Sequence, residues 1–303
     1  MKTKQMERYK DCTLCPRNCH VNRLEGKKGY CGMDGRIFAA RAALHMWEEP
    51  CISGEKGSGA VFFTGCNLRC SYCQNREIAI GSSGLEITSE RLAEIFLELQ
   101  EKGAANINLV TGTHYVPQIV ETLDTARLRG LHLPIVYNCG GYEKVETLRM
   151  LDGYVDVYLP DFKYMEENLA AKLSHAPDYP EIAKIAIKEM VRQTGKCEFG
   201  EDGYIRRGTV VRNLILPGHT KNSVKVLEYL HETYGNEIYL SIMNQYTPVF
   251  HHDKYPELNR KVTAREYEKV LDAAIAMGIE NGFFQDGETA KESFIPTFDY
   301  EGI

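Results

Sequence analysis

The sequence predicts an α/β protein with a partial (β/α)6-type TIM barrel of parallel strands, preceded by a small cysteine-rich N-terminal module. Three observations predict this architecture. Short apolar runs alternate with segments of helical periodicity from residue 60 onward. These runs are continuously apolar, as in parallel strands that are buried on both faces. The first 50 residues instead hold four cysteines and many turn-forming residues, with little periodic pattern.

The expected elements follow one another in strand–helix order. Strands are expected over residues 60–64, 107–111, 134–139, 155–162, 209–216, 238–243 and 282–285. Helices are expected over residues 90–102, 117–129, 142–151, 166–195, 221–234 and 263–277. The first helix should begin after Ser89 as its N-cap. Six or so such units suit a full or partial barrel better than a five-stranded open sheet, and barrels carry their chemistry in the loops after the strands.

A glycine- and serine-rich loop divides the chain. Residues 52–59 read ISGEKGSG, a composition typical of a boundary between structural units. We therefore expect a metal-binding N-terminal module or extension over residues 1–52. The barrel should occupy residues 53–303, which is enough chain for one large α/β domain.

The composition excludes several classes of protein. Hydrophobic residues make up 43% and charged residues 26% of the chain, the balance of a globular protein. The net charge is −6 without a basic stripe, so no nucleic-acid partner is expected. The N-terminus lacks the apolar core of a signal peptide, and no run approaches the roughly 18 apolar residues of a membrane span. We therefore expect a cytoplasmic protein with no membrane partner.

Three of the ten cysteines form a tight motif. Cys66, Cys70 and Cys73 have the spacing C-x3-C-x2-C and begin two residues after the first expected strand. Reduced cytosolic thiols favour metal binding, and three thiolates on a four-iron cluster leave one iron open. Packing on one helix face and a zinc site are the alternatives, although zinc normally needs a fourth ligand. The nearby Gly65 and Asn67 favour a turn over a helix.

This motif resembles that of the radical-SAM superfamily, including the aromatic Tyr72 before the third cysteine. The chain is similar, over nearly its whole length, to the activating-enzyme-like branch of the pyruvate formate-lyase-activating-enzyme family. The segments that carry the similarity are GAVFFTGCNLRCSYCQN, LCPRNCHVNR, EEPCISG, YLPDFKY, RNLILPGH and MNQYTP.

The resemblance implies a [4Fe-4S] cluster on Cys66, Cys70 and Cys73 and S-adenosyl-L-methionine as the second cofactor. Reductive cleavage of that cofactor would yield methionine and a 5′-deoxyadenosyl radical that abstracts hydrogen from a substrate. A low-potential electron donor of the flavodoxin or ferredoxin type is implied as a partner. Three functions stay open: activation of a glycyl-radical enzyme, radical modification of a small molecule or peptide, and a non-catalytic zinc or iron–sulfur protein.

The resemblance also implies where S-adenosylmethionine binds. A glycine-rich stretch follows the second strand in the superfamily, and here residues 111–114 read TGTH instead of Gly-Gly-Glu. Gly112 is the expected contact there. His114 is either a histidine bonded to the backbone or a polar group of the site. Asn138 ends the third expected strand and could contact the adenosine part, as could Asn244 and Gln245 after the sixth.

Charged residues at two further strand ends complete the expected site. Asp161 and Lys163 match an Asp-x-Lys pattern that helps to bind S-adenosylmethionine in activating enzymes. As alternate residues they share one face, with an ordinary ion pair as the alternative. Arg212 matches an arginine near the ribose and carboxylate, and its alternative is a salt bridge to a helix. Tyr72 is expected beside the cofactor.

Four cysteines in the N-terminal module suggest a second metal. Cys12, Cys15, Cys19 and Cys31 fall within twenty residues, a set that can close a zinc site or hold another iron–sulfur cluster. The module has few apolar residues, so metal binding would supply folding free energy. His20 is an alternative ligand, and unrelated reduced thiols are the other reading. The remaining cysteines are expected to be small packed hydrophobes: Cys51, Cys139 and Cys197.

Overall fold

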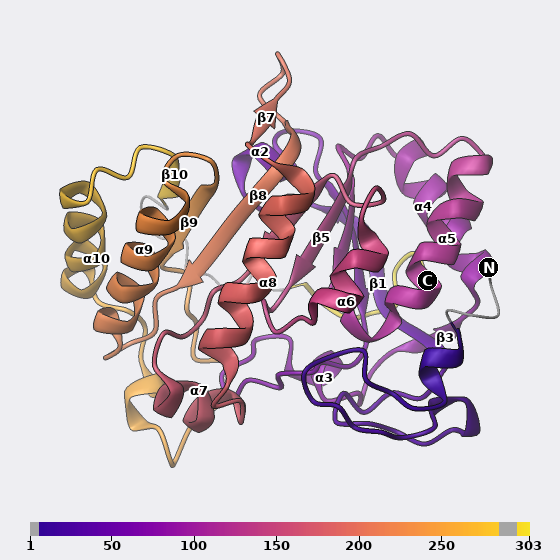
Figure 1. Ribbon diagram of the computed structural model, residues 1–303, viewed down its shortest axis with the longest axis horizontal. Coiled ribbons are helices and arrows are strands. Elements are labelled where there is room, and N and C mark those ends of the chain that lie inside the picture. The colour runs from indigo at the N-terminus through magenta and orange to yellow at the C-terminus, as the bar shows by residue number, and fades with distance from the viewer. Residues whose placement is uncertain (1–5, 285–295) are drawn as a thin grey trace.

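The computed structural model describes residues 6–284 and 296–303. In this part of the chain ten strands form one curved sheet in the order β10-β9-β8-β6-β5-β4-β2-β1-β3, with β7 paired to β8 (Figure 1). Its parallel strands are β2 (Ser58–Phe63), β4 (Ile107–Val110), β5 (Ile135–Cys139), β6 (Val157–Pro160), β8 (Ile205–Leu214), β9 (Tyr239–Met243) and β10 (Gly282–Phe284). The expected α/β fold with a partial barrel of parallel strands is therefore confirmed.

Two antiparallel strands extend the sheet beyond the expected ones. Strand β1 (Ile37–His45) pairs with β2, and β3 (Leu85–Ile87) pairs with β1. We expected residues 37–45 to belong to the N-terminal module, and the structure places them in the sheet instead. Four alanines in this strand hide it, because alanine has a low strand propensity and gives no strong apolar signal. The last residue of the seventh expected strand, Gln285, lies outside the described residues.

The helices agree with the expected alternation. The longer ones are α4 (Ser89–Glu101), α5 (Val116–Leu128), α8 (Tyr179–Thr194), α9 (Thr220–Tyr234) and α10 (Ala264–Ala276). They are joined by α2 (Pro50–Ser53), α3 (Arg76–Ala79), α6 (Val145–Leu148) and α7 (Glu167–Ser174). Short 3-10 turns cover Glu7–Tyr9, Arg23–Glu25, Thr113–Tyr115, Arg149–Leu151 and Pro256–Asn259.

The start of α4 differs by one residue from the expected one. The hydroxyl of Thr88, not that of Ser89, accepts a hydrogen bond from the backbone N–H of Arg91 at 3.0 Å. The backbone of Thr88 is extended while Ser89 is already helical, and an N-cap needs the extended conformation. The expected N-cap was therefore wrong by one position.

A short plug fills the inside of the curved sheet. Cys51 and Ile52 of α2 are buried against Val136, Val157 and Val210, which lie on β5, β6 and β8. Neighbouring residues on these strands point to the opposite face, where the long helices pack, since side chains alternate along a strand. The segment before α2 is thereby held against the inner face of the barrel.

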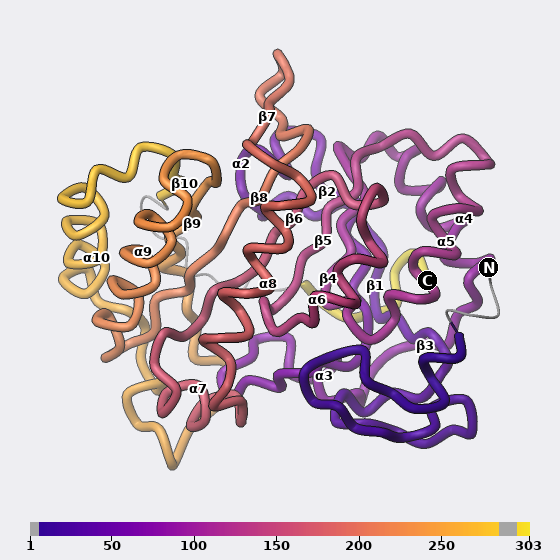
Figure 2. The backbone as a smooth tube through the Cα atoms, viewed as in Figure 1, coloured from indigo at the N-terminus to yellow at the C-terminus, as the bar shows by residue number. Residues whose placement is uncertain are grey.

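The N-terminal segment before β1 lies under one end of the sheet, next to α3 (Figure 2). The hydroxyl of Tyr9 and the guanidinium of Arg23 both donate to the carbonyl oxygen of His114, at 3.0 and 2.7 Å. These contacts attach the segment to the loop after β4. The helices of the described residues are all too short or too polar to cross a bilayer.

Candidate active site

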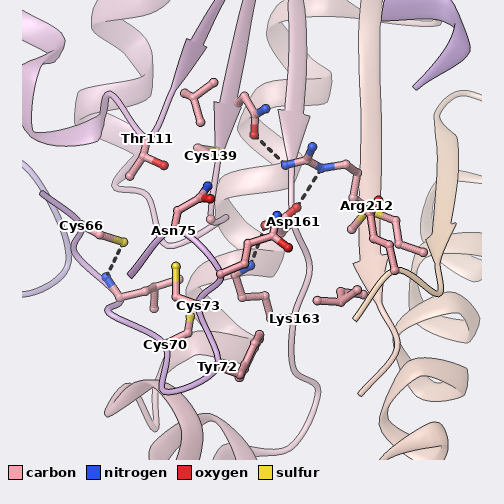
Figure 3. A pocket seen from close by; sticks show the side chains of 18 of the residues that line it. Cys66, Cys70, Tyr72, Cys73, Asn75, Thr111, Cys139, Asp161, Lys163 and Arg212 are labelled. Atoms are coloured by element: carbon pink, nitrogen blue, oxygen red, sulfur yellow. Dashed lines mark hydrogen bonds and ion pairs between the residues drawn. The ribbon is translucent and has the colours of Figure 1, made fainter. Parts of the chain in front are cut away.

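A cavity opens at the carboxyl ends of the parallel strands (Figure 3). The ends of six parallel strands contribute to its wall, each through residues that close or follow the strand. Those residues include Thr111, Asn138, Asp161, Lys163, Arg212 and Gln245. This is the position at which barrels assemble their chemistry from separate loops.

The loop between β2 and α3 brings all three motif cysteines to this cavity. Residues 64–75 form turns and bends and no helix, so the alternative of three thiols packed on one helix face is excluded. Gly65 has a φ of +93°, and a Cβ there would lie 2.5 Å from the Met33 side chain and 2.9 Å from the Cys31 carbonyl. Arg69 also has a left-handed backbone, with φ of +51°. The loop is therefore folded tightly against the N-terminal segment.

The three thiols line the cavity, and two of them accept hydrogen bonds at sulfur. Cys66, Cys70 and Cys73 are each only partly buried and all line the cavity. The backbone N–H of Leu68 donates to Cys66 Sγ at 3.4 Å, and the hydroxyl of Ser174 donates to Cys70 Sγ at 3.0 Å. Such bonds to sulfur tune iron–sulfur clusters.

The electrostatic surroundings of the thiols fit a bound metal cluster. Burial raises the pKa of Cys66, and it raises the pKa of Cys73 to about 12. Both thiols would thus be neutral without a metal, and a coordinated cation is what deprotonates a thiol in such a place. Within the described part of the chain no three Cys, His, Asp or Glu side chains gather closely enough to hold one metal ion.

The ligand count separates a cluster from zinc. A structural zinc ion normally needs four ligands, whereas three thiolates suffice for a cluster that keeps one iron open. Three thiols that face one cavity therefore match the ligand set of a cluster.

A chain of alternating charges lies across the cavity from the thiols. Lys163 Nζ is 2.6 Å from Asp161 Oδ2, and Arg212 Nε donates to Asp161 Oδ1 at 2.9 Å. Burial opposes ionisation of Asp161, but Arg212 and Lys163 outweigh it and lower the pKa of this carboxyl. Asp161 and Lys163 thus face the same way, as the spacing predicted, and they form the ion pair that was the alternative to cofactor binding.

Glu48, in the segment EEPCISG, joins this chain, although it was not among the expected site residues. Its carboxylate lies 2.9 Å from Arg212 Nη1 and accepts from Asn138 Nδ2 at 3.0 Å. Arg212 Nη2 donates to Asn138 Oδ1 at 2.6 Å. No local pattern shows that the segment before α2 is held inside the barrel, so residue spacing does not reveal this contact.

Tyr72 lies at the edge of the cavity as expected. The hydroxyl of Tyr164 donates to Tyr72 Oη at 2.9 Å, and the hydroxyl of Ser174 donates to Cys70 Sγ at 3.0 Å. The hydroxyl oxygens of Tyr164 and Ser174 are 2.7 Å apart, so Tyr72 and Cys70 are connected through adjacent polar groups. Gln245 lines the cavity wall opposite the loop.

Two expected contacts of the second strand lie elsewhere. A Cβ on Gly112 would meet Ile119 at 2.7 Å, so this glycine faces the helix layer and not the cavity. Thr111 lines the cavity instead, with a φ of +61°, a rare and strained value for a β-branched residue. His114 Nε2 is 2.8 Å from the carbonyl oxygen of Thr64, and burial lowers its pKa to about 3. This histidine is neutral and structural.

The remaining cysteines divide between the cavity and the core. Cys139 is buried and lines the cavity, whereas Cys51 is packed in the plug. Cys197 packs beside that plug and donates to a backbone carbonyl. Asn244, expected near Gln245, does not line the cavity.

The N-terminal cysteines all lie in the segment under the sheet, and among the described residues they do not converge closely enough to hold one metal ion. Cys12, Cys15 and Cys31 are buried, and Cys19 accepts a hydrogen bond from the backbone N–H of Tyr30 at 3.2 Å. Burial raises the pKa of Cys15 to about 12, with a smaller effect from the charges of Cys31 and Cys19. His20 pairs with Asp11 at the surface instead of facing these thiols.

The fold and the thiol loop define a class of enzyme that binds an iron–sulfur cluster at the mouth of a partial barrel. A sequence model of the Radical SAM superfamily matches residues 60–230, more than half of the chain. This chain therefore belongs to the Radical SAM superfamily. The family implies a [4Fe-4S] cluster and S-adenosylmethionine, and the donor set described above fits both.

Similar proteins extend this assignment. The uncharacterized protein MJ0674 of Methanocaldococcus jannaschii is 28% identical over 277 residues, which cover 88% of this chain and 75% of MJ0674. The pyruvate formate-lyase-activating enzyme of Clostridium pasteurianum is 28% identical over 116 residues, 36% of this chain and 46% of that enzyme. The match therefore spans less than half of that enzyme.

A solved structure shows the same fold. It is that of Streptococcus suis SuiB bound to S-adenosylmethionine, which aligns with a TM-score of 0.50 and 14% sequence identity. The alignment covers 75% of this chain and 50% of SuiB, so this chain spans about half the length of that protein.

Proposed function

We propose that this protein cleaves S-adenosylmethionine reductively and uses the product radical to take a hydrogen atom from a protein substrate, a glycyl-radical enzyme being the first choice. The observation that carries the proposal is the meeting of Cys66, Cys70 and Cys73 with Asp161 and Lys163 around one cavity. When bound, the cluster supplies one electron to the sulfonium and the cofactor supplies the 5′-deoxyadenosyl radical.

The side chains across the cavity are arranged to hold a zwitterionic ligand. Lys163 Nζ spends one of its three donors on Asp161, so further N–H bonds can reach a carboxylate in the cavity. Asp161 stays ionised and can accept from an amine or a ribose hydroxyl. Arg212 is committed to Asp161, Glu48 and Asn138, so its main contribution is to hold these groups in place.

A protein substrate is supported by two observations. One relative is an activating enzyme for pyruvate formate-lyase. The cavity rim also carries Trp47, whose side chain is 55% exposed. An aromatic side chain at the rim of a charged cavity is the kind of contact that anchors a polypeptide. A low-potential flavodoxin or ferredoxin would deliver the electron.

Cofactor cleavage can be tested directly. The protein is purified without oxygen, reconstituted with iron and sulfide, reduced, and mixed with S-adenosylmethionine. We expect 5′-deoxyadenosine from the native chain and none from Cys70→Ala, which removes a cluster ligand. Cys197→Ala is the matched control, because this thiol lies away from the cavity and should leave the product yield unchanged. A fully loaded, reduced native sample without 5′-deoxyadenosine would refute the proposal.

The substrate is tested separately. The reduced enzyme is incubated with a glycyl-radical enzyme encoded near its own gene and examined by electron spin resonance. A stable glycine-centred signal that requires both proteins supports the proposal. A different result would contradict the choice of substrate. If the cofactor is cleaved, no radical forms in the partner and a small molecule or peptide is modified, the substrate is that small molecule or peptide.

We also propose that the N-terminal segment before β1 binds a second metal through Cys12, Cys15, Cys19 and Cys31. These thiols are grouped and mostly buried in a segment with little core of its own, apart from a small cluster around Tyr9. Metal analysis of the reconstituted chain decides the metal. Iron well above four atoms per chain indicates a second cluster, and one zinc atom per chain indicates a zinc site. A chain that holds neither the additional iron nor the zinc would refute the proposal.

A further inference from the structure

We infer that Glu48 is a positioning residue for S-adenosylmethionine. Its carboxylate orients Arg212 and Asn138 in the wall of the cavity. The inference rests on the proposed function, because it assumes that this cavity binds the cofactor. Glu48 precedes α2 and lies outside residues 60–230, the part of the chain that matches the superfamily. The residue thus comes to the barrel from the segment EEPCISG, which precedes the stretch that matches the superfamily model.

Three donors converge on the Glu48 carboxylate. Oε2 accepts from Arg212 Nη1 at 2.9 Å, while Oε1 accepts from Asn138 Nδ2 at 3.0 Å and from Asn108 Nδ2 at 3.3 Å. The donors come from β8, β5 and β4, three separate strands of the barrel. The Glu48 carboxylate therefore holds together three side chains from strands that are connected along the chain only through long helical segments.

Glu48 closes a four-member row of alternating charge. Lys163, Asp161, Arg212 and Glu48 follow one another through contacts of 2.6, 2.9 and 2.9 Å. Each inner member has an opposite charge on both sides. Without Glu48, Arg212 would keep its ion pair with Asp161 and the charge of the nearby buried Glu49, but its guanidinium could turn away from Asn138. A buried charge in such a row is costly unless it is fully paired.

Only a carboxylate satisfies this position. In Glu48→Gln the amide must place its NH2 either against Arg212 Nη1 or against Asn138 Nδ2, and both atoms are donors. Asn138 cannot turn its amide without losing the bond from Arg212 Nη2 to its oxygen. The conflict therefore falls on the two residues that face the cofactor.

The geometry also indicates a repair. In the double variant Glu48→Gln/Asn138→Asp, the new carboxylate at position 138 accepts from Arg212 and from the new amide. Gln at position 48 then turns its oxygen to Arg212 Nη1. Asn108 can adapt, since its Oδ1 has no hydrogen-bond partner among the described residues and can turn toward the new amide. The net charge of the row is unchanged.

The test measures binding apart from turnover. Affinity of the reconstituted protein for S-adenosylmethionine, and for S-adenosylhomocysteine as a non-reacting probe, is measured by calorimetry. We expect Glu48→Gln to weaken both about tenfold or more, as for other residues that orient a ligand-binding group. The double variant should recover most of the loss. KM for 5′-deoxyadenosine formation should rise more than kcat falls.

The control is Glu189→Gln. Glu189 is a buried carboxylate paired with Arg192 at 2.9 Å on α8, outside the cavity, so its loss tests removal of a paired charge in itself. Iron content and the thermal midpoint are recorded for each variant.

Native affinity in a folded Glu48→Gln, or a double variant as weak as the single one, would overturn the inference. If Glu48→Gln does not fold, a folded double variant with native affinity supports it and one with weak affinity overturns it. Failure of the native protein to form 5′-deoxyadenosine would refute the proposed function instead.

Discussion

At the scale of single residues, the thiol loop depends on one glycine. The backbone of Gly65 has a φ of +93° and is packed on the Met33 side chain, the Cys31 carbonyl and the His114 ring. This is the place where the N-terminal segment, the loop after β4 and the first cluster cysteine meet. A side chain here would have to displace backbone, which a tight core resists.

We expect Gly65→Ala to lower both stability and iron content. The left-handed backbone alone costs roughly 1–2 kcal/mol for alanine. Overpacking against Met33 and Cys31 should add about 1–3 kcal/mol. Gly103→Ala is the control, because its φ is +83° and its Cβ would meet nothing within 4 Å. Chemical denaturation and iron analysis check this, and an equal loss in both variants would show that the contacts of Gly65 have no effect.

At the scale of elements, the N-terminal segment holds the thiol loop in place. Arg17 lies between Cys15 and Cys19 and donates to the carbonyls of Asn67 at 2.8 Å and Ser174 at 2.9 Å. Its guanidinium also covers the Tyr30 ring at 3.9 Å. Asn67 belongs to the thiol loop, and Ser174 donates to Cys70 Sγ. One side chain of the module therefore joins two supports of the cluster site.

Arg17→Ala should loosen the thiol loop. Each carbonyl oxygen that is left without its hydrogen-bond donor lowers the stability of the folded protein by about 1–3 kcal/mol. We expect a lower thermal midpoint and cluster loss at lower chelator concentration. Arg127→Ala is the control, since Arg127 also donates to backbone carbonyls, two where Arg17 has three with that of His175, and covers the ring of Tyr154 outside the cavity. Cluster retention equal to that of Arg127→Ala would contradict a role for Arg17 at the site.

At the scale of the whole molecule, one buried acid links stability to pH. Glu143 is 2% exposed and accepts from the Thr113 hydroxyl at 2.7 Å. Burial raises its pKa to about 8. In the unfolded chain this carboxyl has a pKa near 4.3. In the folded protein Glu143 therefore prefers to be protonated. Folding becomes less favourable at a pH where Glu143 ionises in the unfolded chain.

The sign of the pH dependence follows. The stability associated with protonated Glu143 is complete below about pH 4 and is lost as pH rises toward 8. Glu143→Gln keeps the shape without the ionisation, so it should be more stable than the native protein at pH 8, by about 2–4 kcal/mol. Urea denaturation at pH 6 and pH 8 checks this. A gap between the two proteins that does not widen with pH would contradict it.

Several details show where sequence reasoning stops. Thr88 and Ser89 are both good N-caps, and only backbone conformation decides between them. Gly112 occupies the expected glycine position, yet its neighbour Thr111 turns to the cavity. Asp161 and Lys163 were predicted correctly to face one way, because alternation along an extended chain is a local rule.

The sequence by itself determined the parallel barrel, the thiol loop at the end of its first parallel strand and the strand ends that carry charge. These features depend on residues a few positions apart, whose spacing fixes periodicity and facing. Only the tertiary structure decided that β1 joins the sheet, that α2 plugs the barrel and that Glu48 meets Arg212, 164 positions away in sequence. The reason is physical: burial of a charge is decided by partners from distant segments, and no local pattern records them.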